Sequence, residues 1–537
     1  MALTLLGGIG IFLLGMVLLT DGLKAAAGGA LRGVLGRLTG GPLKAVASGA
    51  AITALVQSSS ATTLATIGFV SAGLLTFQQS VGVILGANIG TTSTGWIVSV
   101  LGLKANIATV ALPLVAVGAL MRLLGRERTA SIGLALAGFG LIFVGIEFMQ
   151  DGMAGLADDI DLGAVSADGV GGRLVLAGIG LLMTVLMQSS SAAVATTLTA
   201  VFTGAIGLEA AAALVVGQNV GTTVTAAVAA IGASTPAQRT ALAHIGFNVL
   251  TATAAFLLLP LVPALADATG LQDDPAIAVA AFHTGFNFLG VALLLPVAAP
   301  YARVIERLIP ERDGALTRHL DPSVASISPV ALEAARRTLL NVATVEYRAI
   351  IAILGRDGGS HPNGRALADA RPALAEARRF LALVRTSPDS TAEYHRHVDL
   401  LHAIDHLDRM LDALAESHHA TVARTPGPLH EASMRLAGGI HAALDWVAAP
   451  DGSAPLDDLG AMSAALAADR RHHRRELLAR AAGFLSPDDA MRQVDAMMWL
   501  DRLGYHAWRA AVHLAGTEAD AAADVAAYDE REARPAG

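Results

Sequence analysis

Two polar segments interrupt apolar stretches of the 537-residue sequence, and both read Gln-Ser-Ser-Ser. The first lies in TALVQSSSATTLATIGFV (residues 53–70) and the second in TVLMQSSSAAVATTLTAV (residues 184–201). Polar groups within a membrane-spanning segment are costly, and as a rule they are functional. The plainer alternative is that the hydroxyls and the amide only satisfy backbone groups at a break in a helix. The repetition of the segment favours a functional site.

The chemistry available to these segments is that of neutral donors and oxygen ligands. A helix broken inside the membrane exposes N-terminal N–H groups, whose positive dipole end suits an anion. No Lys or Arg occurs at residues 45–103 or 174–238, so an anion there would rest on amides, hydroxyls and dipoles. Burying a multivalent oxyanion without a cation is costly, and oxygens of unwound helices suit sodium. The pattern therefore favours a cation-coupled anion carrier over a simple pore.

The composition divides the chain into two unlike parts. Of its 37 basic and 45 acidic residues, only 12 and 13 lie in residues 1–310. We therefore expect an all-α polytopic membrane part, followed by a soluble, charged helical part. The net charge of −8 argues against nucleic-acid binding, and the lack of cysteine excludes disulfides, thiol catalysis and Cys-based metal sites. Residues 1–19 lack the basic start and cleavage site of a signal peptide, so we expect a retained span in the lipid bilayer.

The apolar segments predict seven simple crossings and two broken ones. About 20 apolar residues cross the hydrocarbon core as a helix. Residues 43–77 and 174–207 are too long for one crossing, and each has QSSS at its centre. Each is therefore predicted to be a re-entrant hairpin that enters the membrane, breaks and returns. The simple spans are predicted at residues 3–22, 80–102, 105–123, 132–150, 210–232, 239–262 and 276–299.

Loop charges predict the orientation. Basic residues gather in residues 24–44, 122–128 and 303–318, whereas acidic residues gather in 151–168 and 267–274. Seven crossings and two hairpins place every basic loop on one side, which the positive-inside rule identifies as the cytoplasm. The N-terminus is then outside and the C-terminal part is cytoplasmic.

The membrane part contains an internal repeat. The two QSSS segments are 131 positions apart, and so are GANIGTTST (86–94) and GQNVGTTVT (217–225). GMVLLTDGL (15–23) matches GIEFMQDGM (145–153) at a spacing of 130. Three matches at nearly one offset indicate a duplication.

The predicted topology makes the two copies inverted. The first copy, about residues 1–125, starts outside, and the second, about residues 130–262, starts inside. An extra helix follows at about residues 276–299. Inverted repeats with broken helices near the midplane are typical of secondary transporters, with substrate bound where the halves meet.

At these motifs the chain resembles the type II sodium–phosphate cotransporter family, whose hallmark is two QSSS segments, each followed by an N-x-G-T-T element. The resemblance covers roughly residues 1–310. It implies a secondary active transporter that carries inorganic phosphate with sodium as the coupling ion, by alternating access, across a bacterial cytoplasmic (inner) membrane. It implies neither enzyme activity nor an organic cofactor.

The resemblance also nominates the site, residue by residue. The substrate ligands it implies are Gln57, Ser58, Ser59, Ser60, Gln188, Ser189, Ser190, Ser191, Asn88 and Asn219. The sodium ligands it implies are Ser60, Thr62, Thr63, Thr91, Thr92, Ser191, Thr222 and Thr223.

Two further polar elements, HIGFN (244–248) and HTGFN (283–287), recur 39 positions apart in the second half only. Two roles are open for them: lining the cavity or relaying protons, and hydrogen bonding between neighbouring helices. The residues concerned are His244, Asn248, His283 and Asn287.

The C-terminal part is predicted to be helical. After a connector at residues 310–329, apolar residues recur at helical spacing through residues 330–522, with a break at TPGP (425–428). Two consecutive three-helix bundles are expected, and this part resembles a PhoU-like domain. Residues 523–537 are predicted to be disordered. A second copy of the chain or a cytoplasmic regulatory protein are the partners left open for this part.

The PhoU-like resemblance bears on metal binding in this part. It implies that Asp408 and Asp412 form an acidic metal-binding helix, because they share one helix face at i, i+4. In the second half Asp501 is present, but Tyr505 stands where the next acid would be needed. The sequence thus argues against a multinuclear metal cluster.

Three other functions are left open by the residues. A membrane-anchored phosphate sensor would act through its C-terminal part on a cytoplasmic partner. A proton-coupled carrier of a related oxyanion would use His244, His283 and Glu147. An intramembrane hydrolase would pair a serine with a histidine, but the first copy has no histidine to match its serines, and a nucleophile needs a base and an oxyanion hole.

Overall fold

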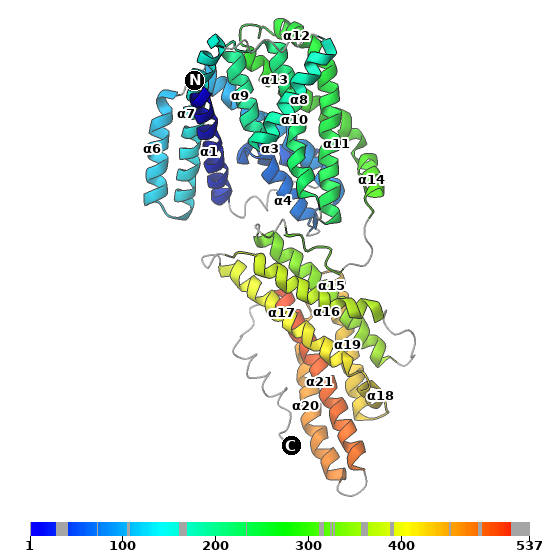
Figure 1. The fold of residues 1–537 in the computed structure, drawn as a ribbon. Helices are drawn as coiled ribbons and strands as arrows, with labels where there is room; N and C mark the ends of the chain where they lie inside the picture. The colour runs from blue at the N-terminus through cyan, green and yellow to red at the C-terminus, as the bar shows by residue number, and fades with distance from the viewer. Residues whose placement is uncertain are drawn as a thin grey trace. The chain divides into compact units, whose positions relative to one another are not determined.

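The computed structural model describes residues 2–27, 41–71, 74–104, 108–159, 169–231, 234–310, 316–322, 325, 328–355, 364–386, 391–450, 453–481 and 486–516. Within these ranges the protein is helical and has no strand. The chain forms two compact units, Met1–Glu311 and Arg312–Gly537 (Figure 1). The predicted disordered tail and parts of the predicted connector lie outside the described residues.

The first unit is an all-α polytopic membrane protein, as predicted. Seven of its described helices are long and apolar enough to cross a membrane: Ala2–Ala26, Phe77–Lys104, Glu127–Gly155, Gly169–Met187, Leu208–Val228, Thr235–Ala268 and Pro275–Leu308. Its α-helices are α1 (Ala2–Ala27), α3 (Pro42–Val56), α4 (Ser59–Ser71), α5 (Phe77–Trp96), α6 (Ala108–Leu124), α7 (Glu127–Asp159), α8 (Gly169–Met187), α9 (Ser190–Phe202), α10 (Leu208–Ala229), α11 (Thr235–Leu258), α12 (Val262–Ala268), α13 (Pro275–Leu294) and α14 (Ala298–Leu308). Short π- and 3-10 segments complete it: η1 (Ile97–Lys104), η3 (Leu259–Leu261) and η4 (Leu295–Val297).

Both segments predicted to break do so at their QSSS motif. α3 ends and α4 begins around Gln57 and Ser58, and α8 ends and α9 begins around Gln188 and Ser189. α8 differs from the expected short arm, because its 19 residues are enough to cross a membrane. Its counterpart α3 is shorter because Pro42 stands at its first turn, where proline commonly begins a helix.

α6 also differs from the simple span that was predicted. It has 17 residues, fewer than the roughly 20 that a perpendicular crossing needs. The predicted start at residue 105 lies outside the part of the chain that the structure describes. α6 packs along α7 at one edge of the unit, and α7 in turn packs along α1 (Figure 1).

The two copies pack internally through the same contacts. A Cβ atom on Gly86 would lie 1.9 Å from the carbonyl oxygen of Val46, and one on Gly217 would lie 1.7 Å from that of Ala177. Only glycine allows α5 to approach α3, and α10 to approach α8, this closely. Both members of the second pair are 131 positions beyond those of the first, so the duplication seen in sequence is also one of packing.

α1 and α7 pack antiparallel. A contact that α1 makes with α7 recurs, at the repeat offset of 130, as a contact that α7 makes with α1. A Cβ atom on Gly8 would lie 3.0 Å from the carbonyl oxygen of Gly145, and one on Gly138 would lie 2.6 Å from that of Gly15. Adding 130 to Gly8 gives Gly138, and subtracting it from Gly145 gives Gly15. Each helix thus takes the place of the other under a half-turn, which is the relationship that an inverted repeat produces.

The interior of the first unit is a single large apolar cluster that includes the second arm of the second hairpin. Phe12 of α1, Phe143 of α7, Leu198 of α9, Val215 of α10 and Phe286 of α13 all belong to it. Inside a membrane, such side chains are held together by close van der Waals packing rather than by their removal from water. α9 is therefore held in the core rather than at the surface.

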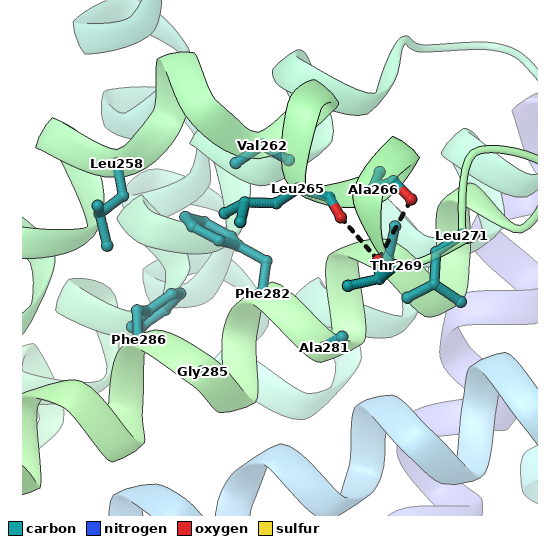
Figure 2. A pocket seen from close by; sticks show the side chains of 11 residues that line it. Leu258, Val262, Leu265, Ala266, Thr269, Leu271, Ala281, Phe282, Gly285 and Phe286 are labelled. Carbon is teal, nitrogen blue, oxygen red and sulfur yellow. Dashed lines mark hydrogen bonds between the residues drawn. The ribbon is translucent and has the colours of Figure 1, made fainter.

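A cavity of about 280 Å³ lies between α11, α12 and α13 (Figure 2). Its one hydroxyl, that of Thr269, is hydrogen-bonded to the carbonyl oxygens of Leu265 and Ala266 at 2.7 and 3.2 Å. The other lining side chains are apolar, among them Phe282 and Phe286. An oxyanion would find no donor there, so this cavity is not the substrate site.

The second unit consists of two sets of three long helices joined by a short one. The first set is α15 (Ser328–Leu354), α16 (Gly364–Leu383) and α17 (Thr391–Ala415), followed by α18 (His419–Ala423). The second set is α19 (Pro428–Ala448), α20 (Leu456–Ala481) and α21 (Pro487–Ala515).

Buried side-chain hydrogen bonds join the two sets. The Tyr347 hydroxyl donates to the Ala507 carbonyl oxygen at 3.1 Å, and the Trp499 indole donates to that of Ala413 at 2.7 Å. The predicted break at TPGP coincides with the start of α19 at Pro428. The PhoU-like identity of this unit stays a prediction.

Candidate functional site

The break in each hairpin is built in the same way. Gln57 and Gln188 both adopt the left-handed helical conformation, with φ of 55° and 51°. This conformation costs a residue with a Cβ atom on the order of 1 kcal/mol. The next residue, Ser58 or Ser189, accepts a hydrogen bond from the backbone N–H three positions on, at 3.2 Å in each copy. The strained glutamine and the serine cap that follows it are thus repeated at matched positions, and strain of this kind persists only where the surrounding structure maintains it.

The first hairpin folds back on itself. The Thr53 hydroxyl of α3 donates to the Thr62 hydroxyl of α4 at 2.9 Å. In an unbroken helix these residues would be about 13 Å apart along the axis. The carbonyl group of Val56, which the break frees, accepts a hydrogen bond from Thr20 of α1 at 3.1 Å.

The second hairpin folds back onto a glutamine of α10. The Gln218 side chain is fully buried, and its amide donates to the Ala193 carbonyl oxygen at 3.1 Å and to the Thr197 hydroxyl at 2.7 Å, both on α9. The Thr184 hydroxyl of α8 donates to the backbone carbonyl oxygen of Gln218 at 3.2 Å. Sequence reasoning missed Gln218, because Ala87 occupies its place in the first copy.

The two QSSS segments meet at one point, which we name the first junction: Gln57, Thr94 and Ser191. Thr94 donates to the Gln57 side-chain carbonyl oxygen at 2.9 Å, and its oxygen lies 3.3 Å from the Ser191 hydroxyl. Because the Thr94 proton is directed at Gln57, Ser191 must be the donor to Thr94. The Gln57 amide donates in turn to the Ser93 hydroxyl at 2.9 Å.

The symmetry-related residues, Gln188, Thr225 and Ser60, form the second junction, which is open. Gln188 and Ser60 are exposed, whereas Gln57 and Ser191 are each 8% exposed. The Thr225 hydroxyl donates to the carbonyl oxygen of Thr222 on its own helix, at 3.0 Å. The structure thus brings together two predicted site residues, Gln57 and Ser191, through Thr94, which was not predicted. Their counterparts in the second junction do not make these contacts.

The other residues nominated for the substrate site surround these junctions. Ser59 and Ser190 begin α4 and α9 and are partly exposed. Asn88 donates to the Ile84 carbonyl oxygen of its own helix at 2.9 Å, whereas Asn219 donates to the Asn248 side chain at 2.8 Å. The matched asparagines therefore play different parts in the two copies.

The threonines nominated for sodium are mostly bound to their own helices. Their hydroxyls donate to backbone carbonyl groups three or four positions back, which leaves the oxygen lone pairs available to a cation. These are Thr62, Thr91, Thr92, Thr222 and Thr223. The Thr63 hydroxyl is buried and has no hydrogen-bond partner within the part of the chain that the structure describes.

The HIGFN and HTGFN elements lie within the packed interior on α11 and α13. Asn248 and Asn287 are fully buried, and each donates its amide to the carbonyl oxygen of the histidine four positions before it, at 3.0 and 2.9 Å. Among the described residues, the Nδ1 atoms of His244 and His283 have no hydrogen-bond partner. The contact of Asn248 with Asn219 fits the interhelical role that the sequence left open.

The acidic helix of the second unit is engaged by arginine. Arg371 of α16 lies 3.1 Å from Asp408 and 2.6 Å from Asp412 of α17. Glu346 of α15 is fully buried, and burial together with the charge of Asp408 raises the pKa of its carboxyl well above the usual range. Among the described residues there is no group of three or more His, Asp or Glu side chains placed to bind a metal ion.

The histidines of α17 and α21 form a buried cluster of their own. His406 and His506 approach with their Nδ1 atoms 3.0 Å apart, and His513 lies 3.0 Å from Asp399. Burial and the neighbouring imidazoles lower the pKa of His406 to about 2, so this ring is neutral at ordinary pH.

Comparison with known proteins decides the family. The family model described as Na+/Pi-cotransporter matches residues 11–151 and 162–294, which hold both QSSS segments and both G-x-N-x-G-T-T elements. The chain belongs to the Na+/Pi-cotransporter family. The resemblance noted from the motifs is therefore confirmed, and the family is one of transporters rather than enzymes.

Two relatives of the chain are similar over more than half of its length. The Bacillus subtilis protein named "Uncharacterized protein YqeW" is 35% identical over 308 residues, which are 56% of this chain and 96% of YqeW. The Escherichia coli protein named "Putative inorganic phosphate export protein YjbB" is 31% identical over 349 residues, which are 63% of this chain and 62% of that protein. No solved structure was found to match the cotransporter chain. Family and relatives together support phosphate transport.

Proposed function

We propose that this protein is a sodium-coupled symporter of inorganic phosphate that works by alternating access. The observation that carries the proposal is the first junction, where Gln57 of one QSSS segment and Ser191 of the other share the Thr94 hydroxyl. A site shared by two inverted halves is where secondary transporters bind substrate. The hydrogen-bond donors at this point are neutral hydroxyl and amide groups. Such a site carries no positive charge of its own, so it suits an anion that binds together with cations.

Phosphate is held in this proposal by helix ends and hydroxyls. α4 and α9 begin at Ser59 and Ser190, directly after the breaks, so their N-terminal N–H groups and dipoles favour an anion. Exposed Ser60 and Gln188 supply further donors. No Lys or Arg is present in residues 45–103 or 174–238 to neutralise the charge, which is why cations must accompany phosphate.

Sodium is assigned to the hydroxyl oxygens next to the breaks. Hard cations of this kind prefer oxygen ligands, and the threonine oxygens near each QSSS segment keep lone pairs after donating to their own helices. The buried Thr63 hydroxyl, to which no described residue is hydrogen-bonded, is the first candidate ligand in the first copy. In the second copy Val194 occupies the position of Thr63, and the candidate there is the side-chain oxygen of fully buried Gln218, which has no hydrogen-bond partner among the described residues.

The direction of net transport is proposed to follow the sodium gradient, which means uptake. Export is the second candidate, and the printed name of the relative YjbB favours it. A carrier with alternating access moves phosphate either way, so the imposed gradients decide the direction. Vesicles loaded with labelled phosphate, with sodium inside or outside, distinguish the two.

The place of the protein and the role of its second unit complete the proposal. We assign it to the bacterial cytoplasmic membrane, with the N-terminus outside and the second unit in the cytoplasm, from the basic loops described above. The second unit is proposed to regulate transport, through a cytoplasmic partner or a second copy of the chain. A membrane-anchored phosphate sensor would need the same binding site but would move no phosphate.

Equilibrium binding tests the proposed site before any flux is measured. Labelled phosphate should bind to the purified full-length protein at least about tenfold more tightly in sodium than in potassium, because bound sodium offsets the charge of phosphate. A tenfold difference in affinity corresponds to about 1.4 kcal/mol of binding free energy. Equal binding in both salts would refute sodium coupling at this site.

A further inference from the structure

The two junctions contain the same three residue types in two different states. In the first junction, Ser191 donates to Thr94 and Thr94 donates to Gln57, so one hydroxyl ties α9 to α5 and to the break of the first hairpin. In the second, Thr225 is bonded to its own helix. The equivalent bond in the first copy would run from the Thr94 hydroxyl to the Thr91 carbonyl oxygen, but Thr94 donates to Gln57 instead. The difference lies in which partner the threonine hydroxyl selects.

The hairpins themselves do not differ in the same way. Both glutamines keep the left-handed conformation, and each amide donates to the carbonyl oxygen three positions back, Gln57 to Ala54 at 2.5 Å and Gln188 to Val185 at 2.7 Å. The asymmetry therefore arises between the hairpins and the helices that face them. α4 already packs against α10, so Ser60 and Thr225 lie on neighbouring helices.

We propose that the second junction closes when the first opens, and that Thr94 and Thr225 are the residues that make each closure. In the closed second junction, Ser60 donates to Thr225 and Thr225 donates to the side-chain oxygen of Gln188. Thr225 reaches this state by releasing the carbonyl oxygen of Thr222, which needs only a change of its side-chain rotamer. The substrate site between the junctions then opens to opposite sides of the membrane in the two states.

One difference between the copies explains which junction is closed in the structure. The Gln57 amide has Ser93 as a second partner, at 2.9 Å. The matching position in the second copy is Val224, which has no hydroxyl. A closed second junction thus lacks one hydrogen bond, so the state with the first junction closed is favoured without ligand.

The absence of cysteine from the chain makes a direct test simple. Two double variants of the full-length protein are reconstituted in vesicles: Thr94→Cys with Ser191→Cys, and Ser60→Cys with Thr225→Cys. Each is oxidised in potassium, in sodium, and in sodium with inorganic phosphate. Thiols left unreacted are then counted by the mass added by a maleimide-linked polymer, with the four single variants as controls.

We expect both cysteine pairs to form disulfides. Between the three solutions, the disulfide yield of one pair should fall where the yield of the other rises. Adding Val224→Ser should raise the yield of the Ser60–Thr225 pair, and adding Ser93→Val should lower that of the Thr94–Ser191 pair. Each change should be about fivefold, as one neutral hydrogen bond would produce. Correct insertion of each variant is checked by the reactivity of its single-cysteine controls.

Two results would overturn the inference. One is a Ser60–Thr225 pair that keeps both thiols in all three solutions while the Thr94–Ser191 pair closes. The other is two yields that rise and fall together. The inference rests on the proposed transport cycle, but the disulfide yield does not depend on uptake. Vesicles in which the junctions exchange without phosphate flux would contradict the proposed function and leave the exchange established.

Discussion

Thr94 and Ser191 lie in opposite halves of an internal repeat, 97 positions apart in the chain, and their hydroxyl oxygens are 3.3 Å apart. Through Thr94, a serine of the second QSSS segment is connected to the glutamine of the first. The contact joins α9, which begins at the second break, to α5, which runs beside the first. It makes the two motifs one site rather than two separate patches of polar residues.

Replacing the glutamines tests this site. Gln57→Ala and Gln188→Ala should each lower phosphate uptake by at least about tenfold. Loss of Gln57 leaves the buried Thr94 hydroxyl without its acceptor, which costs on the order of 1–3 kcal/mol. Loss of exposed Gln188 removes one of the donors that the proposal assigns to phosphate. Gln78→Ala, an exposed glutamine of α5, is the matched control and should leave uptake unchanged. Both variants must reach the membrane in normal amounts. Near-normal uptake by both would remove these residues from the site.

Glycine packing can be tested within one helix. A Cβ atom on Gly180 would lie 2.0 Å from the Leu214 carbonyl oxygen, whereas one on Gly178 would meet nothing within 4 Å. Gly180→Ala should lower the thermal unfolding midpoint in detergent by several degrees, since overpacking costs about 1–3 kcal/mol. Gly178→Ala should leave it unchanged or raise it slightly. Equal midpoints for the two variants would contradict the close packing of α8 on α10.

Glu346 gives the second unit a pH dependence of known sign. Its pKa is raised in the folded protein, so from about pH 4.5 upward the unfolded chain releases a proton that the folded one retains. The contribution of this carboxyl to stability is therefore complete below that pH and is lost as the pH rises toward the folded pKa. Glu346→Gln should gain in unfolding temperature over the parent as the pH is raised from 4 to 7.

Exposed Glu431 on α19 supplies the control for that series. Glu431→Gln should show the same difference from the parent at every pH. A Glu346→Gln variant whose difference from the parent does not change between pH 4 and 7 would show that this carboxyl ionises normally.

Removal of the second unit tests whether the first is sufficient for transport. The chain divides between Glu311 and Arg312, and the QSSS segments and their partners all lie before that point. A chain ending near residue 320 should keep sodium-dependent uptake within about twofold of the full-length protein, measured at equal amounts in the vesicle. A well-folded, inserted truncation that carries no phosphate would show that the second unit is part of the transport machinery.

Sequence predicted the helical class, the breaks at Gln57 and Gln188, and the duplication. Each of these depends on local composition or on a fixed offset, which a single chain displays directly. The motif GANIGTTST includes Thr94 as its last residue, and GQNVGTTVT includes Thr225, so the 131-residue offset held a signal for both. The resemblance implies a role only for the earlier threonines of each motif, Thr91, Thr92, Thr222 and Thr223, and not for Thr94 and Thr225.

The remaining features depend on how distant segments meet. That Thr94 contacts Ser191 follows from the packing of α5 against α9, which no spacing contains. That Gln57 is buried while Gln188 is exposed is a property of one conformation, and the matched sequences around the two cannot express it. The length of α8 was missed because both segments were predicted to be hairpins of the same form, whereas α3 begins at Pro42 and α8 begins further from its break, at Gly169.

Sodium-driven flux of phosphate is the most direct test of the central claim. Labelled phosphate uptake should be measured in proteoliposomes of the full-length protein, under an inward sodium gradient and then with potassium replacing sodium. The account predicts accumulation above the external phosphate concentration in sodium and none in potassium. Equal uptake in the two salts, or none in either by a correctly inserted protein, would contradict it.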